Sequence, residues 1–232
     1  MSIITVYSRG EPPARRTVTA EANRALLRQA GVRTVSIVGG PGCGKTTLIE
    51  RTIRRTLSDR RAGIIVCTDG RGADAVMLNA LHRPIVQLEL GGDESPDPWL
   101  LRSALDHFDL KAVDLLLIEN VGTYAGRPAQ LGQEFTVALF SVAAGHDKAA
   151  KHPATVVAAD VVLLSKTDLL PFVPFDVARF RADVERLNPS ARFFALSAKT
   201  GDGLDAWIEW MRLGAPGSGQ TPQKPADLVS AE

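Results

Sequence analysis

The chain has 232 residues, of which 45% are hydrophobic and 23% are charged, and its formal net charge is +1. This composition is typical of a globular protein with one sizeable core, and the small net charge provides no general attraction to nucleic acid or to an acidic membrane. Only two cysteines are present, and no apolar run approaches the roughly 18 residues that a membrane span needs. We therefore expect a cytoplasmic protein without a disulfide framework, and neither nucleic acid nor membrane as a partner.

Apolar, strand-like segments alternate with helical patterns along most of the chain. Residues 1–16 show no clear period, and residues 19–31 predict a helix that ends at Gly31. Further strands are predicted at 34–39, 63–68, 114–119, 137–143, 160–165 and 192–197, and helices at 44–57, 98–108, 176–187 and 203–212. The alternation predicts an α/β fold in which helices cover a mostly parallel central sheet in three α/β/α layers.

The domain organisation follows from where this alternation begins and ends. We expect one folded domain at 21–213, preceded by an N-terminal extension at 1–20. Residues 214–232 are rich in Gly, Pro and Ser, a composition that is typical of a disordered tail.

Residues 37–48 read IVGGPGCGKTTL, a strand end followed by a glycine-rich turn and the start of a helix. They match the pattern G-x-x-x-x-G-K-[ST], in which backbone N–H groups surround a polyphosphate at the positive end of a helix. Lys45 would reach the β- and γ-phosphates, and the Thr46 hydroxyl would bind Mg²⁺. The motif predicts the fold of a P-loop NTPase. The nucleotide-binding residues predicted here are Gly39, Gly42, Cys43, Gly44, Lys45, Thr46 and Thr47.

Two short stretches that follow later strands indicate the base. SKTD at 165–168 and SAK at 197–199 would lie at the carboxyl edge of the sheet, where such sheets bind ligands. The Asp168 carboxylate can accept from guanine N1–H and from the 2-amino group, whereas adenine has neither donor there, so we predict GTP. The Lys166 stem would cover the base, and the Ala198 N–H would meet O6. The guanine contacts predicted here are Lys166, Asp168, Ser197, Ala198 and Lys199.

Ser165 departs from the more usual N-K-x-D, which has asparagine at this position. Serine is too short to bridge the base edge and the phosphate loop together, as an amide can. We therefore expect the nucleotide to bind more weakly.

The stretch DLLLIENVG at 114–122 contains an apolar strand whose last residue is the acidic Glu119. Glu119 can hold Mg²⁺ through water or orient the attacking water, and Gly122 would let the backbone approach the γ-phosphate; the alternative is that Glu119 caps a helix. Asp69 is the predicted switch acid, with Asp74 as the alternative. The predicted catalytic residues are Lys45, Glu119 and Asp69, and the predicted Mg²⁺ ligands are Thr46, Glu119 and Asp69.

Together these motifs resemble those of the HypB nickel-insertion GTPases, which with UreG form a branch of the SIMIBI P-loop GTPases. The likeness runs from about residue 21 to residue 211 and includes ENVG at 119–122 and GHDK at 145–148. The resemblance implies slow, Mg²⁺-dependent GTP hydrolysis in hydrogenase maturation, with a metalloenzyme or metallochaperone as partner. It also implies a GTP-dependent homodimer, built around the loops at 69–81 and 122–131.

The metal-binding residues usual in HypB proteins are not matched in this sequence. The family carries a Cys-His pair after the switch-I helix and a cysteine shortly after ENVG. Here these stretches read NALHRPIVQLELGG and ENVGTYAGRPAQLG, with Gly126 at about the cysteine position. Thiolate and imidazole are the ligands that suit Ni²⁺, so we predict no Ni²⁺ or Zn²⁺ site.

Three interpretations of the function follow. The chain is a maturation GTPase that drives a partner's metal delivery without holding the metal, a paralogue that serves another metalloenzyme, or a GTP-binding regulatory module with little hydrolysis. Identifying the client protein would distinguish the first interpretation from the second. Measuring the rate of GTP turnover would distinguish the third from both.

Overall fold

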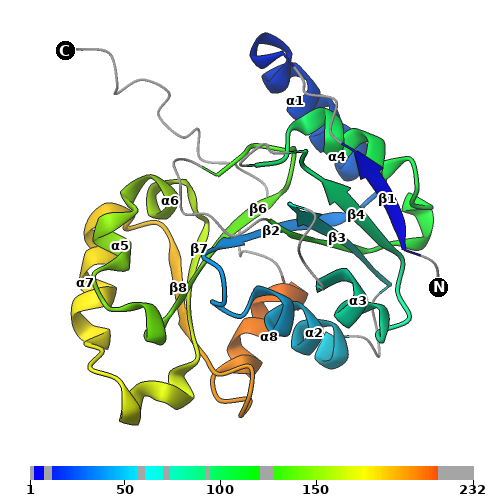
Figure 1. The fold of residues 1–232 in the computed structure, drawn as a ribbon. Coiled ribbons are helices and arrows are strands. Elements are labelled where there is room, and N and C mark those ends of the chain that lie inside the picture. Colours follow the sequence, from blue (N-terminus) through cyan, green and yellow to red (C-terminus); the bar gives the residue numbers. More distant parts are fainter. Residues whose placement is uncertain are drawn as a thin grey trace.

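The structure, a computed structural model, describes residues 3–7, 12–56, 61–69, 74–91, 95–120 and 128–213. Within these residues a single sheet has the strand order β1-β4-β3-β5-β2-β6-β7-β8, and every neighbouring pair is parallel (Figure 1). The strands are β1 (Ile4–Tyr7), β2 (Arg33–Gly39), β3 (Ala62–Thr68), β4 (Ile85–Glu89), β5 (Leu115–Glu119), β6 (Phe135–Ser141), β7 (Val161–Ser165) and β8 (Arg192–Ala195).

Helices cover both faces of this sheet (Figure 1). One face carries α2 (Lys45–Thr56), α3 (Asp74–Asn79) and α8 (Leu204–Leu213), and the other carries α1 (Pro13–Gln29), α4 (Pro98–Leu105), α5 (Lys148–Lys151), α6 (Pro153–Ala158) and α7 (Val177–Leu187). Short 3-10 helices are η1 (Leu110–Ala112), η2 (Val142–Ala144) and η3 (Thr167–Phe172). The predicted α/β/α fold is confirmed. None of the helices described is long and apolar enough to cross a bilayer.

Alternate residues of the central strands fill the two cores. Val35 and Ile37 of β2 pack in the cluster that includes helices α2 and α8, whereas Val38 packs in the cluster that includes α7. This alternation follows from the period of two in a strand, and apolar burial on both faces explains why β2 is a nearly continuous apolar run.

The structure differs from the sequence prediction at the N-terminal edge. Strand β1 pairs in parallel with β4, with Ile4 opposite Val86, and neither strand was predicted. Helix α1 begins at Pro13 rather than at residue 19. Because β1 is an edge strand whose residues are exposed or half-buried, its sequence has no strong apolar period. Part of the predicted extension therefore contributes to the sheet.

The connections of β2 place its carboxyl end at a switch point of the sheet. Strand β2 lies between β5 and β6. The chain leaves β2 through α2 on one face, whereas the connection from β6 to β7 runs through α5 and α6 on the opposite face (Figure 1). Crossovers that diverge in this way leave a crevice at the carboxyl ends of the strands, where α/β proteins bind ligands.

Candidate nucleotide-binding site

Glycine builds the loop between β2 and α2. A Cβ at Gly39 would lie 2.5 Å from the Leu139 carbonyl oxygen and 2.8 Å from Cys43 Sγ, so no side chain fits there. Gly42 and Gly44 have φ values of 68° and 97°, which side-chain-bearing residues rarely adopt. Helix α2 begins directly after Gly44. The loop therefore makes the tight turn of a phosphate-binding nest at a helix N-terminus.

Lys45 holds its ammonium group across this loop. Its Nζ donates to the carbonyl oxygens of Gly39 at 3.0 Å and Gly40 at 3.3 Å, and its side chain is buried. An ammonium group has three donors, so one N–H direction is left after these two bonds. The loop thus positions a cation beside its own backbone N–H groups.

Two acids meet the next side chain, Thr46. Its Oγ1 lies 2.6 Å from Glu119 Oε1 and 3.0 Å from Asp74 Oδ1. The pKa of Glu119 is raised to about 7, chiefly because the side chain is buried; the Thr46 hydrogen bond and the charge of Lys45 act to lower this pKa, and the charge of Asp74 acts to raise it. Glu119 Oε2 is buried, and no described residue hydrogen-bonds to it. Paired carboxylates around a hydroxyl, one with an unsatisfied oxygen, fit the hard oxygen ligands that Mg²⁺ takes.

The acid that reaches Thr46 from the switch region is Asp74. The sequence favoured Asp69, but the Asp69 side chain is exposed just past β3, and Asp74 opens α3 beside the loop. A helix-opening aspartate has the pattern of a capping residue, so no local signal marked its contact with Thr46. We now take Asp74 in place of Asp69 as the candidate acid beside Mg²⁺, and the ligand assignment itself stays a prediction.

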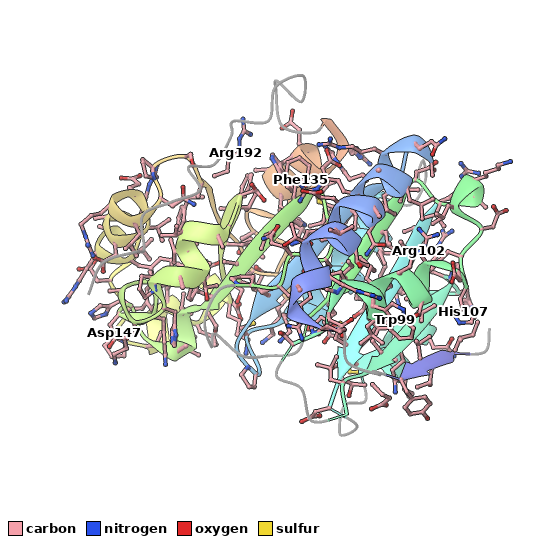
Figure 2. All side chains as sticks on the ribbon, turned by 90° about the horizontal axis from the view of Figure 1, so that it is seen from above. Trp99, Arg102, His107, Phe135, Asp147 and Arg192 are labelled. Carbon is pink, nitrogen blue, oxygen red and sulfur yellow. The ribbon has the colours of Figure 1, made fainter. Side chains whose placement is uncertain are left out.

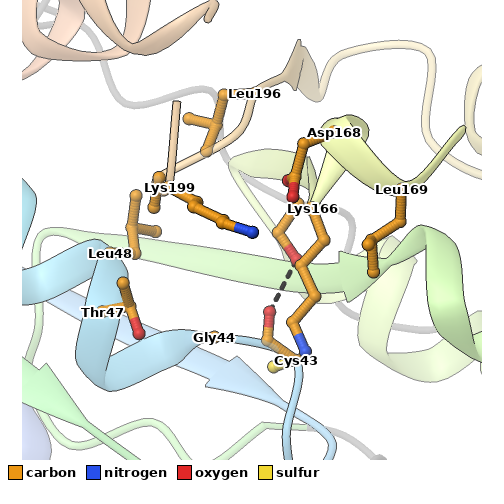
Figure 3. Close-up of a pocket in the computed structure, with 11 residues that line it drawn as sticks. Cys43, Gly44, Thr47, Leu48, Lys166, Asp168, Leu169, Leu196 and Lys199 are labelled. Carbon is orange, nitrogen blue, oxygen red and sulfur yellow. Dashed lines mark hydrogen bonds between the residues drawn. The ribbon is translucent and has the colours of Figure 1, made fainter. Parts of the chain in front are cut away.

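A cavity of about 280 Å³ adjoins the loop (Figure 3). Asp168 and Lys199 reach its rim from the loops that follow β7 and β8, so the two predicted base motifs meet in space (Figure 3). Ser197 Oγ donates to Asp168 Oδ1 at 2.7 Å and so fixes the orientation of that carboxylate. The cavity is lined by Cys43, Gly44, Thr47, Leu48, Ser165, Lys166, Asp168, Leu169, Leu196, Ala198 and Lys199.

Lys166 adopts a backbone conformation that is uncommon for a residue with a side chain. Its φ is 60° and its ψ is 37°, in the left-handed region. The Lys166 Cε lies 3.9 Å from the position that a Cβ on Gly44 would take, so the lysine stem extends over the phosphate loop. Such conformations persist where the surroundings hold them, and they gather at binding sites.

Ser165 retains one of the two contacts expected of an asparagine. Its hydroxyl donates to the Cys43 carbonyl oxygen at 2.6 Å, and both residues are buried. Serine is therefore long enough to connect β7 to the phosphate loop. This contact was not foreseen, because the sequence does not reveal how closely β7 approaches the loop.

Other predicted positions are not brought into this site. Gly122 and Gly126 lie outside the described residues. The histidines are dispersed: His107 lies beside α4, and Asp147, the neighbour of His146, lies at the opposite end of the molecule (Figure 2).

In the described ranges no three His, Cys, Asp or Glu side chains converge as a metal site. Because residues 92–94 and 121–127 lie outside these ranges, the absence of a Ni²⁺ or Zn²⁺ site stays a prediction. Burial raises the pKa of both Cys43 and Cys67.

Comparison with known proteins identifies relatives of the whole domain. The family model "CobW/HypB/UreG, nucleotide-binding domain" matches residues 33–195. Hydrogenase maturation factor HypB of Azotobacter vinelandii is 36% identical over 193 residues, which cover 83% of this chain and 64% of that relative. The chain thus spans less than two thirds of the length of this relative.

Two crystal structures of HypB proteins superpose well on the chain. HypB of Archaeoglobus fulgidus has a TM-score of 0.79 and 33% identity, covering 86% of this chain and 98% of its own. HypB of Helicobacter pylori, solved in complex with nickel, has a TM-score of 0.80 and 26% identity, covering 85% of this chain and 93% of its own. The chain therefore belongs to the CobW/HypB/UreG family and, within it, to the HypB proteins.

Proposed function

We propose that the chain is an Mg²⁺-dependent GTPase that supports the maturation of a nickel-containing hydrogenase. The observation that carries this proposal is the Thr46 hydroxyl, which lies between two carboxylates directly after Lys45 and beside the cavity that contains Asp168. This arrangement combines a phosphate-binding loop, a set of hard oxygen ligands and an acceptor for a base within one site.

The phosphate end would bind and polarise the triphosphate. Thr46, Glu119 and Asp74 would hold Mg²⁺, and the ion would supply positive charge at the β- and γ-phosphates. The Lys45 ammonium would donate to the same oxygens with its remaining N–H. Glu119 closes β5 and opens no described helix, which favours a role in orienting water or Mg²⁺ over the alternative of a helix cap.

The base end would select guanine. Ser197 holds one oxygen of Asp168, and the carboxylate can accept from N1–H and the 2-amino group of guanine. An adenine in the same position would leave this carboxylate without a donor, which is costly at a desolvated edge. The aliphatic stem of Lys166 and the backbone N–H of Ala198 would complete the contacts, with Lys199 at the rim.

Helix α3 would link the nucleotide to a GTP-dependent homodimer. Asp74 lies at the Thr46 hydroxyl, and the same first turn of α3 exposes Val76 (68%) and Met77 (57%). Exposed apolar side chains beside a switch acid are the kind of surface that a second copy would bury. Light scattering with GDP, with a non-hydrolysable GTP analogue and without nucleotide tests this step, and an identical mass in all three would contradict it.

The client is inferred from the relatives. Those relatives are named hydrogenase maturation factors, and one was solved with nickel. We propose that this chain uses GTP to drive metal delivery by a partner rather than holding the metal itself. A paralogue that serves another metalloenzyme and a regulatory module with little hydrolysis are the alternatives.

The decisive experiment measures GTP turnover together with the co-purifying client. Purified chain should hydrolyse GTP but not ATP, and EDTA should abolish the activity. Tagged chain loaded with a non-hydrolysable GTP analogue should then retain a metallochaperone or hydrogenase subunit, whereas chain loaded with GDP should not. No GTP turnover above buffer would favour the regulatory alternative, and capture of an unrelated metalloenzyme would favour the paralogue.

A further inference from the structure

The Ser165 hydroxyl has already used its only proton within the protein. Ser165 ends β7 and lines the cavity, and its Oγ donates to the Cys43 carbonyl oxygen at 2.6 Å (Figure 3). Ser165 is buried, with only 4% of its surface exposed. A hydroxyl has one donor and two acceptor lone pairs. What Ser165 can offer to a ligand in the cavity is therefore an acceptor only.

The edge of the purine that would face Ser165 also offers only an acceptor. In the arrangement proposed above, with Asp168 at N1–H and the 2-amino group and Ala198 at O6, the imidazole ring of guanine would point toward the cavity wall that Cys43, Gly44 and Ser165 form. Its N7 carries no proton. Two acceptors do not form a hydrogen bond, so Ser165 cannot bind N7, whereas an amide side chain has two N–H donors and could serve both partners.

The two lysines that line the cavity do not replace this donor. Lys166 extends over Gly44, and its Cε lies near the phosphate loop. Lys199 is exposed at the rim, where an ammonium group on a flexible stem is hydrated and lacks a fixed direction.

From this we infer a specificity-determining property of the chain: the base pocket does not read purine N7, and it accepts guanine nucleotides in which carbon replaces that nitrogen. The inference rests on the proposed GTPase function, because it concerns the base site of that function. Ser165 acts here as a positioning residue, which holds the Cys43 carbonyl and with it the phosphate loop. Recognition of guanine is left to the N1, 2-amino and O6 groups.

A competition experiment tests the inference on the unmodified chain. GTP and 7-deaza-GTP each displace a fluorescent GDP analogue, and the ratio of their dissociation constants is the measured quantity. We expect this ratio to be within about twofold of one, because no hydrogen bond to N7 is lost. Tight binding of GTP with 7-deaza-GTP at least about fivefold weaker, the size of one ordinary hydrogen bond, would overturn the inference and leave the GTPase proposal intact.

Three variants separate base reading from positioning. Ser165→Asn adds a second donor and should favour GTP over 7-deaza-GTP by about three- to tenfold. Ser165→Ala removes the bond to Cys43 and should weaken both nucleotides by the same factor, so that the ratio is unchanged. Asp168→Asn is the matched control, since both nucleotides keep N1–H and the 2-amino group and should weaken equally. If GTP itself fails to displace the probe from the unmodified chain, the guanine site and this inference are both rejected.

Discussion

The phosphate end and the base end of the site are built in different ways. At the phosphate end, the loop glycines, Lys45 and Thr46 follow one another in the chain, and Lys45 is held by carbonyl oxygens five and six residues away. At the base end, the Ser165 contact to Cys43 joins residues 122 positions apart, and the Ser197 contact to Asp168 joins residues 29 positions apart. The first end is a local motif, whereas the second depends on the packing of β7 and β8.

This difference predicts how each end responds to substitution. A change at the phosphate end removes charge where the triphosphate is bound, so it should affect every nucleotide and the rate of hydrolysis. A change at Asp168 of the base end should alter which nucleotide is chosen, because that carboxylate would face only the base, whereas Ser165 also contacts the phosphate loop through Cys43. Asp74 of α3 and Glu119 of β5 would act on the phosphates, so they are part of the phosphate end. Unlike the loop residues, however, they reach Thr46 through tertiary contacts.

The largest effect is expected for Lys45→Ala. This variant deletes the buried cation of the loop, so GTP hydrolysis should fall by about a thousandfold and GTP binding should weaken strongly. Steady-state turnover and calorimetric titration measure the two effects. Arg54→Ala is the control, because Arg54 is an exposed cation of the same helix paired with Glu50 and should leave both unchanged. Turnover that survives in Lys45→Ala would contradict the phosphate-site assignment.

Asp168→Asn should change the choice of base. The asparagine loses the charged acceptor for guanine but can donate to the 2-carbonyl of xanthine, so GTP should weaken by about a hundredfold while XTP gains relative to GTP. The affinity for ATP should not be better than that for GTP in the unmodified chain, and it should not rise in Asp168→Asn. The measurement is a competition among the three triphosphates.

Asp205→Asn is the matched control for this change, since the Asp205 side chain is 88% exposed on α8 and should not alter the ratio of GTP to XTP. A constant ratio in Asp168→Asn would mean that Asp168 does not read the base. In that case the base end would need to be assigned to other residues of the cavity.

A smaller and more selective effect is expected for Glu119→Gln. The amide keeps the shape of the side chain but loses its charge, so hydrolysis should slow by about tenfold or more while GTP affinity changes less. Single-turnover rates and titration separate the two effects.

The stability of the nucleotide-free protein provides a second measurement on this variant. Burial disfavours the charged form of Glu119, so its replacement by a neutral amide should leave the free energy of unfolding unchanged or higher. Equal losses of affinity and rate together with a lower stability would favour a structural role for Glu119.

The smallest effect concerns the contact that connects α2 to α8. Trp207 Nε1 donates to Thr52 Oγ1 at 2.8 Å, and Thr52 in turn donates to the Leu48 carbonyl oxygen at 2.7 Å. Thr52→Val leaves the buried indole N–H without a partner, which should lower the free energy of unfolding by about 1–3 kcal/mol. Denaturant titration measures the loss, and Thr52→Ser, which keeps the hydroxyl, should lose less. Equal losses in the two variants would mean that the hydrogen bond is not the stabilising feature.

The predictions from sequence were reliable where a signal was local or periodic. The apolar runs at β2, β3, β5 and β7 were predicted because buried parallel strands are continuous apolar segments. Strands β1 and β4 were missed: β1 is a half-exposed edge strand, and β4 is a short run of five residues. The short helix α3 was missed for a similar reason, because its exposed Val76 and Met77 obscure an amphipathic pattern.

The sequence by itself determined the phosphate loop, the parallel α/β core and the candidate residues for guanine, because these depend on neighbouring residues or on a regular period. Only the tertiary structure decided that Asp74 rather than Asp69 lies at the Thr46 hydroxyl, and that the Ser165 proton is donated to Cys43. Both contacts depend on how α3 and β7 pack beside the loop. A hydrogen bond forms only within about 3 Å, and no local pattern in the chain specifies a distance that short between distant segments.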